Sequence, residues 1–222
     1  MTLTANAVPF QSASDVLHAL PRIAAHLRAH HILAHPTETL YGFGSSVAPD
    51  AVDALIAFKG RSENKPFLLL VSGPGMLNML RLRVTPDAER LAAAFWPGPL
   101  TLIMPTEINM HRALRGPSGG IAVRWTAHPG MQRAIETYGA PITSTSANRP
   151  GLPPARSAQE IVTEWRAPAA TGDLMVLDGG ELAVTRGSTV VDCTEETTRI
   201  VRAGILGAGT LRSAVPDLVG DE

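Results

Sequence analysis

Lysine is rare in this chain and is confined to one short segment. The sequence contains nineteen lysines and arginines, but only Lys59 and Lys65 are lysines, and Arg61 lies between them. An ammonium is a mobile point charge and a guanidinium is a planar fork, so this segment could bind a polyphosphate. A solvated turn in a chain that favours arginine has the same composition. The other polar segments must decide between these interpretations.

Three further polar segments interrupt or end apolar runs, at residues 36–42, 144–148 and 186–189. Loops at strand ends are where α/β sheets bind ligands. Their hydroxyl, amide and backbone N–H groups can surround a small polar substrate or a phosphate without net charge. Ser, Thr, Asn and Gly also favour ordinary turns, and each segment taken alone is better explained as a turn.

Several common motifs are incomplete. Gly42-Phe-Gly44 lacks both the third glycine of a dinucleotide loop and the Gly-Lys-Ser/Thr of a P-loop. His26 and His30 have helical spacing but lack the glutamate of the zinc-hydrolase helix, so a solvated face explains them better. His35 borders the 36–42 segment and is best explained as a satisfied histidine at a strand end.

The composition is that of a globular protein. Among 222 residues 45% are hydrophobic and 18% charged, and the formal charge of −1 provides no global attraction for nucleic acid. The single cysteine, Cys193, excludes an intrachain disulfide and a cysteine-based zinc site. The N-terminal residues lack a signal-peptide pattern, and no stretch approaches the roughly 20 apolar residues of a membrane span. We therefore expect a cytoplasmic protein without membrane contact.

Helical and strand patterns alternate along the first two thirds of the chain. Apolar spacing predicts a helix over residues 14–29 with an irregularity at Pro21, and a second helix capped by Asp50 and ended by Gly60. Thr85-Pro86 and His128-Pro129 begin two more helices. Strands are predicted from the apolar runs at residues 32–34, 66–71, 100–104, 120–125 and 141–146.

Strands dominate the last third. A capping box at residues 157–160 predicts a short helix to Trp165, and β-prone runs follow at 174–177, 188–193 and 199–201. The last two runs are expected to form a hairpin. The sequence thus predicts a single-domain α/β fold over residues 12–212, a twisted mixed β-sheet flanked by helices. Residues 1–11 and 213–222 are expected to be flexible termini.

Taken in order, the polar segments resemble the Sua5/YrdC family of L-threonylcarbamoyladenylate synthases. The family has a Pro-Thr-Glu/Asp-Thr-x-Tyr-Gly loop, a Lys-x-Arg segment leading to Lys-Pro, and the motifs Trp-Pro-Gly-Pro-x-Thr, Ala-Val-Arg, Ser-Thr-Ser-Ala-Asn and Ser-Thr-Val-Val-Asp. In this chain they occur at residues 36–42, 59–66, 96–101, 122–124, 144–148 and 188–192. The similarity runs from about Ile32 to Leu206 and implies a YrdC-like fold.

The resemblance implies a nucleotidyltransferase. Such enzymes convert L-threonine, bicarbonate and ATP to threonylcarbamoyl-AMP and pyrophosphate, and a tRNA threonylcarbamoyltransferase machinery uses the product to make N6-threonylcarbamoyladenosine at tRNA position 37. The reaction needs cations for phosphates, a clamp for the amino-acid carboxylate and no covalent nucleophile. Mg²⁺ is expected to accompany ATP, held mainly by phosphates and waters, with no metal-ligating residue in the protein.

The resemblance also assigns site residues. Lys59 and Arg61 are expected to be catalytic, and the late arginine of the family corresponds to Arg202, fourteen positions after Ser188. The predicted nucleotide-binding residues are Lys59, Arg61, Lys65, Ser146, Asn148 and Arg202, with Lys65 facing pyrophosphate. The predicted threonine-binding residues are Thr37, Arg124, Ser144 and Ser188.

Two departures keep an alternative open. Ser62 and Ala203 stand where family members commonly have proline, so both loops should be less rigid here. The alternative is a YrdC-like paralogue that binds double-stranded RNA or tRNA without synthase activity, although the near-zero net charge argues against it. Under the main interpretation any tRNA contact is expected to be weak. A carbamoyladenylate-handling domain of a carbamoyltransferase fits less well, because those proteins append further catalytic or metal-binding domains.

Overall fold

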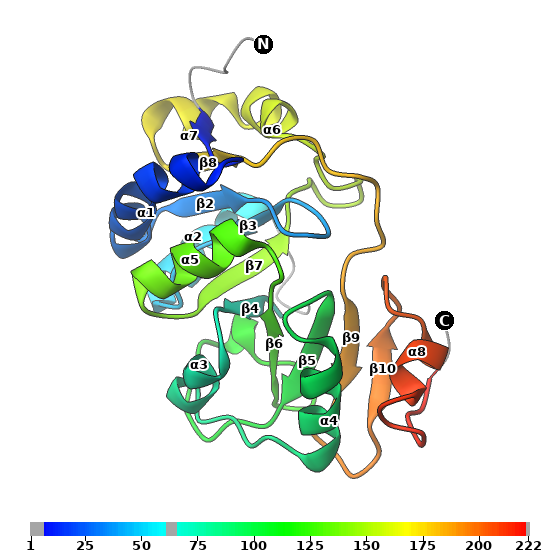
Figure 1. Ribbon diagram of the computed structural model, residues 1–222. Helices are drawn as coiled ribbons and strands as arrows, with labels where there is room; N and C mark the ends of the chain where they lie inside the picture. Colours follow the sequence, from blue (N-terminus) through cyan, green and yellow to red (C-terminus); the bar gives the residue numbers. More distant parts are fainter. Residues whose placement is uncertain (1–6, 61–65, 221–222) are drawn as a thin grey trace.

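The computed structural model describes residues 7–60 and 66–220, and within them the strands form one ten-stranded sheet. The strand order is β1-β8-β2-β3-β7-β4-β6-β5-β9-β10, with parallel and antiparallel neighbours (Figure 1). The strands are β1 (Ala7–Pro9), β2 (Ile32–His35), β3 (Gly42–Gly44), β4 (Leu68–Val71), β5 (Leu100–Met104), β6 (Ile121–Trp125), β7 (Ile142–Ser146), β8 (Leu174–Asp178), β9 (Thr189–Asp192) and β10 (Arg199–Arg202). The predicted mixed α/β sheet is confirmed.

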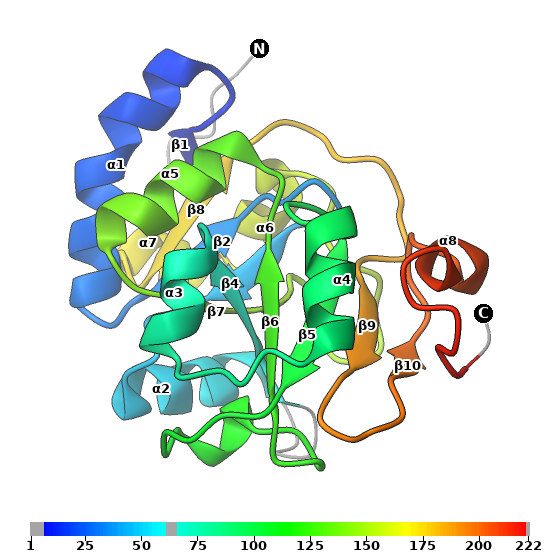
Figure 2. The ribbon, with the colours of Figure 1, turned by 60° about the horizontal axis from the view of Figure 1, so that its bottom comes forward.

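Helices flank the sheet along its length. The α-helices are α1 (Ala13–Arg28), α2 (Pro49–Lys59), α3 (Pro74–Met79), α4 (Pro86–Phe95), α5 (Pro129–Tyr138), α6 (Ala158–Glu164), α7 (Arg166–Thr171) and α8 (Ala208–Arg212), and η1 (Arg112–Leu114) is a 3-10 turn. The first helix packs beside α5, while α6 and α7 contact β8 (Figure 1). At the other end α3 contacts β4 and α4 contacts β5 (Figure 2).

Most helix boundaries follow the capping residues of the sequence. Thr85 accepts a hydrogen bond from the backbone of the first turn of α4, as its position before Pro86 predicts. Gly60 ends α2 in the left-handed region at φ 56°, which glycine adopts without the steric cost of a Cβ. The prediction that Asp50 caps α2 is wrong, because Pro49 already occupies the first turn and Ala48 is the N-cap. Asp50 lies inside the first turn, where its side chain accepts hydrogen bonds from the Ala51 backbone N–H at 3.0 Å and from His30 at 2.7 Å.

Strand β3, which like β1 is not predicted from the sequence, contains two glycines in three residues. They allow β7 to approach, since a Cβ on Gly44 would lie 2.2 Å from the Thr143 carbonyl oxygen and one on Gly42 would lie 2.9 Å from that of Thr145. Antiparallel pairing with both β2 and β7 compensates for the low strand propensity of glycine.

Order extends into both segments that the sequence predicts to be flexible termini. Residues 7–9 form β1 and pair with β8, and Phe10 is buried in the core. At the other end Val215 and Leu218 are buried, and Val219 forms a bridge with Arg199. The structured part therefore begins before residue 12 and ends after residue 212, because burial of apolar side chains offsets the entropy of ordering these segments.

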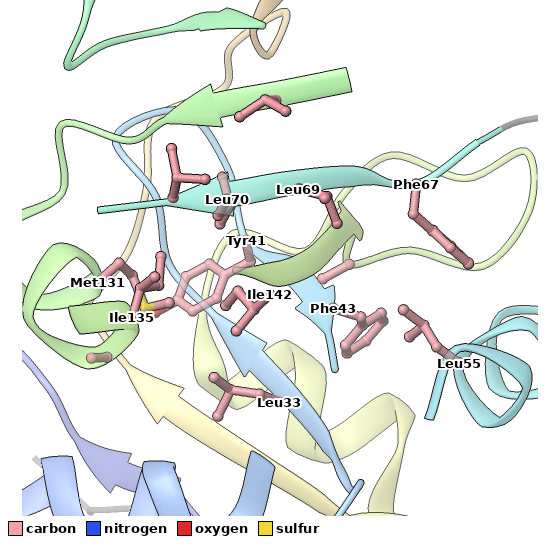
Figure 3. Packing of buried hydrophobic residues seen from close by; sticks show 14 of the residues in the cluster. Leu33, Tyr41, Phe43, Leu55, Phe67, Leu69, Leu70, Met131, Ile135 and Ile142 are labelled. Carbon is pink, nitrogen blue, oxygen red and sulfur yellow. The ribbon is translucent and has the colours of Figure 1, made fainter. Parts of the chain in front are cut away.

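The core is continuous through the centre of the sheet. Tyr41 and Ile142 lie beside Met131 of α5, whereas Phe43 points to the side of Leu55 on α2 (Figure 3). Each such side chain contributes about 1.5–3 kcal/mol when it is fully buried. Because Tyr41 and Phe43 belong to this core, the end of the polar segment of residues 36–42 is fixed by core packing.

Candidate active site

Arg124, near the end of β6, lies at the centre of one polar cluster and is only 4% exposed. Its Nε donates to the Gly98 carbonyl oxygen at 3.2 Å, and its Nη1 donates to Thr39 Oγ1 at 3.1 Å. Its Nη2 lies 2.8 Å from Glu38 Oε1 in an ion pair. The guanidinium is therefore fixed by three groups from two separate segments.

Glu38 balances the charge of this arginine. It also accepts a hydrogen bond from Thr126 Oγ1 at 2.6 Å. Burial acts to raise the pKa of Glu38, but the charge of Arg124 and the hydrogen bond from Thr126 outweigh it, and the pKa lies below the usual glutamate value. Glu38 is therefore ionised at neutral pH and keeps Arg124 in place.

Thr37 shapes the turn that carries Glu38 and Thr39. Its Oγ1 donates to the Leu40 carbonyl oxygen at 2.8 Å and accepts from the backbone N–H groups of Thr39 and Leu40. Such local hydroxyl-to-backbone bonds are typical of threonine in tight turns. Through Thr39, which bonds to both, the structure brings Thr37 and Arg124 together.

Ser188 joins the same cluster from the segment before β9. Its Oγ lies 2.8 Å from Thr101 Oγ1 and accepts from Arg202 Nη2 at 2.9 Å. Antiparallel pairing of β9 with β10 places Arg202 beside it. Partial burial and the charge of Arg124 lower the pKa of the Arg202 guanidinium. Arg202, predicted to bind nucleotide, thus contacts a residue predicted to bind threonine.

Lys59 is the centre of a second cluster. Its Nζ donates to the Ser146 carbonyl oxygen and to Asn148 Oδ1, both at 2.9 Å, and also to the Asn148 carbonyl oxygen. The ammonium lies 5.7 Å from the centre of the Phe43 ring. Ser146 Oγ donates to Asn148 Oδ1 at 2.7 Å. Three residues predicted to bind nucleotide are therefore in direct contact.

Pairing of β3 with β7 links the two clusters. Ser146 pairs with Gly42, the residue that ends the polar segment carrying Thr37. Ser144, two positions before Ser146 on the same strand, contacts His35 through its hydroxyl at 3.3 Å. Arg61 and Lys65 lie outside the described residues.

The prediction overlooked several members of the first cluster. Glu38 and Thr39 lie in a segment that the sequence singled out, but their partners depend on the fold. Thr101 carried a signal, because it is a polar residue within an apolar strand. Thr126 and the Gly98 carbonyl carried none, since backbone and turn groups acquire a role only through proximity.

The cavities on the part of the chain that the structure describes include two whose lining residues bear on the position of the site. One, of about 300 Å³, is lined by Arg186, Ile200 and residues 203–208 and adjoins the first cluster, because the backbone of Gly204 packs on Ser188. The other, of about 490 Å³, is lined by Arg83, residues 85–87, residues 194–196 and Thr198, and no predicted site residue in the described part of the chain lines it. No described helix is long and apolar enough to cross a membrane.

The fold and the site define an α/β protein with two buried cationic clusters on one mixed sheet. The sequence model of the Sua5/YciO/YrdC family, described as "Telomere recombination", matches residues 25–204. The chain belongs to this family.

Two relatives and one solved structure show how similar the chain is to known members. A threonylcarbamoyl-AMP synthase of Pyrococcus abyssi is 33% identical over 199 residues, 89% of this chain and 57% of the relative. One of Alkalilimnicola ehrlichii is 39% identical over 148 residues, 66% of this chain and 77% of the relative. The crystal structure of P. abyssi Sua5 complexed with L-threonine superposes with a TM-score of 0.83 at 29% identity and covers 96% of this chain and 62% of that one. The chain thus spans less than two thirds of the length of the P. abyssi proteins.

Proposed function

We propose that the protein is a threonylcarbamoyl-AMP synthase. The amino group of L-threonine combines with bicarbonate to give a carbamate and water. A carbamate oxygen then attacks the α-phosphorus of ATP, and the bond to the β-phosphate oxygen breaks, releasing pyrophosphate. The observation that carries the proposal is the buried Arg124 fork, held beside Ser188 and the Thr37 turn in a chain similar to a Sua5 that was crystallised with L-threonine.

The first cluster suits the amino acid. The described contacts use Nε, Nη1 and Nη2 of Arg124 once each, so N–H groups at both terminal nitrogens remain for a carboxylate. The Thr37 and Ser188 hydroxyls provide polar partners for the rest of threonine. Glu38 keeps the guanidinium oriented while the substrate binds.

The second cluster suits the phosphates in two ways: it has a positive charge, and it holds the loop of residues 146–148 in a fixed shape. Lys59 already donates to three acceptors of residues 146–148, so its ammonium fixes this loop while adding a positive charge near it. Preorganised cations stabilise negative charge that develops on a transferring phosphoryl group. Arg61, Lys65 and Arg202 remain the predicted cations for the phosphates, and Ser146 and Asn148 the predicted polar partners.

Mg²⁺ would arrive with ATP. Within the described residues no group of three His, Cys, Asp or Glu side chains could hold a metal, and Glu38 is engaged by Arg124 and Thr126. Phosphate oxygens and water are therefore the ligands that fit, and the ion would neutralise phosphate charge. Cys193 offers no nucleophile, because burial raises the pKa of its thiol to about 12.

The product is a reactive mixed anhydride, which the tRNA threonylcarbamoyltransferase machinery would consume in the cytoplasm. A direct contact with tRNA would be weak, because the formal charge of −1 gives little attraction for a polyanion. The same charge disfavours the RNA-binding alternative.

The test is pyrophosphate release from ATP with Mg²⁺ and bicarbonate, with and without L-threonine. We expect release only with threonine, and its loss in Lys59→Ala. Arg90→Ala removes an exposed arginine that pairs with Asp87 and should behave like wild type. Absence of threonine dependence in folded protein would overturn the proposal. Salt-sensitive, sub-micromolar RNA binding in the same sample would then favour the alternative.

A further inference from the structure

His35 is a fully buried imidazole that the proposed reaction does not use. It is the last residue of β2, and its Nε2 lies 3.3 Å from the hydroxyl of Ser144 on β7. Within the described part of the chain, its Nδ1 has no hydrogen-bond partner. A buried histidine whose side-chain hydrogen bond goes to a residue predicted to bind substrate can do more than fill space.

The fold leaves room for this ring by placing glycines opposite it. A Cβ on Gly42 would lie 3.0 Å from His35 Cε1 and 3.0 Å from Ser144 Oγ, and one on Gly44 would lie 3.4 Å from His35 Nε2. A side chain at Gly42 would therefore push the imidazole and the hydroxyl from their positions. The backbone of β3 thus fixes the geometry of the His35–Ser144 contact.

The imidazole stays neutral in this environment. Burial lowers the pKa of His35 to about 4. The interaction with the Pro36 backbone acts in the opposite direction, and the positive charges of His128 and Arg124 lower the pKa further. A neutral ring offers one donor nitrogen and one acceptor nitrogen, so Nε2 makes a hydrogen bond of one sense with Ser144. The hydrogen-bonding positions of the Ser144 hydroxyl that the ring does not use then point away from the ring.

We propose that His35 is a positioning residue, which fixes the Ser144 hydroxyl in the direction in which it meets the amino-acid substrate. The inference rests on the proposed function, because it requires that threonine binds beside Ser144. It assigns a role to a histidine that otherwise resembles an ordinary core residue. Its action is indirect, since the fully buried ring reaches the substrate only through Ser144.

The experiment compares four proteins: wild type, His35→Leu, Ser144→Ala and the double variant. Removing one neutral hydrogen bond should lower kcat/KM for threonine about three- to tenfold in His35→Leu, with KM for ATP unchanged. In the Ser144→Ala background, His35→Leu should have no further effect. His35→Gln places an amide near the position of Nε2 and should restore most of the activity.

Three outcomes separate the possibilities. Wild-type protein without threonine-dependent release overturns the proposed function and this inference together. Active wild type with an unaffected His35→Leu, or with equal losses from His35→Leu in both backgrounds, overturns the positioning role alone. If His35→Leu does not fold, His35→Gln and a second polar variant, His35→Asn, decide: Asn places its amide near Nδ1, so activity equal to that of Gln would overturn the inference.

Discussion

The two polar clusters are built differently. Around Arg124, side chains from five segments bond mainly to one another, and one of them is a carboxylate. Around Lys59, a single ammonium binds two carbonyl oxygens and one amide oxygen from one short loop. The first arrangement holds a rigid fork for a ligand of defined shape, whereas the second holds a loop in shape around a point charge. Loss of the central residue should therefore unbalance charge in the first cluster and loosen backbone in the second.

Arg124→Ala should have the largest effect on stability and activity. A small effect would contradict the difference that we describe between the two clusters. It leaves Glu38 without its cation, which should cost about 3 kcal/mol of unfolding free energy. Threonine-dependent kcat/KM should fall about 100-fold, because charge-assisted hydrogen bonds are lost. Urea unfolding and pyrophosphate release measure the two effects. Adding Glu38→Gln should recover stability but not activity, and recovery of both would contradict the assigned role.

Acidification should destabilise the region around the first cluster through His35. Its folded pKa of about 4 lies below the ordinary value of 6.5, so the unfolded chain binds a proton that the native protein excludes. The stability is complete above pH 6.5 and is lost progressively down to about pH 4. The loss should be about 3 kcal/mol. Urea unfolding across this range measures it, and His35→Gln should flatten the profile. An unchanged profile in this variant would assign the loss to other groups.

Asn148→Ala should act on the second cluster alone. It removes the side-chain oxygen shared by Lys59 and Ser146, so the loop of residues 146–148 should loosen. We expect KM for ATP to rise about tenfold while KM for threonine stays constant. Steady-state kinetics with each substrate varied in turn measure the split. A rise in both KM values would mean that the clusters do not act separately.

Thr101→Val should have the smallest effect on activity. It tests whether Thr101 belongs to the first cluster functionally. It keeps the shape of the side chain but removes the hydroxyl that bonds to Ser188. We expect about a threefold rise in KM for threonine. Thr106→Val is a matched control, because its hydroxyl bonds to the Leu80 carbonyl oxygen, a group outside both clusters. Equal effects of the two variants would indicate general destabilisation.

Most residues of the two clusters could be singled out from the sequence, but the hydrogen bonds and ion pairs between them could not. Capping and apolar patterns gave most helices and strands, and the predicted hairpin of β9 and β10 explains why Arg202 reaches Ser188. Short elements such as β1 and β3 escaped prediction, because partners distant in sequence stabilise them. The contribution of Glu38 also escaped, since it depends on burial and on a neighbour eighty-six positions away.

The connection from β8 to β9 carries Ser188 without regular secondary structure of its own. Gly179 donates to Tyr41 Oη at 2.9 Å, and that hydroxyl donates to the Gly180 carbonyl oxygen at 2.8 Å. Further along, Thr185 Oγ1 donates to the Thr39 carbonyl oxygen at 2.7 Å. An untethered connection would gain about 1–2 kcal/mol of backbone entropy per residue released. Order in the turn of residues 37–41 and order in this connection are thus thermodynamically linked, and a ligand that restrains one lowers the entropic cost of restraining the other.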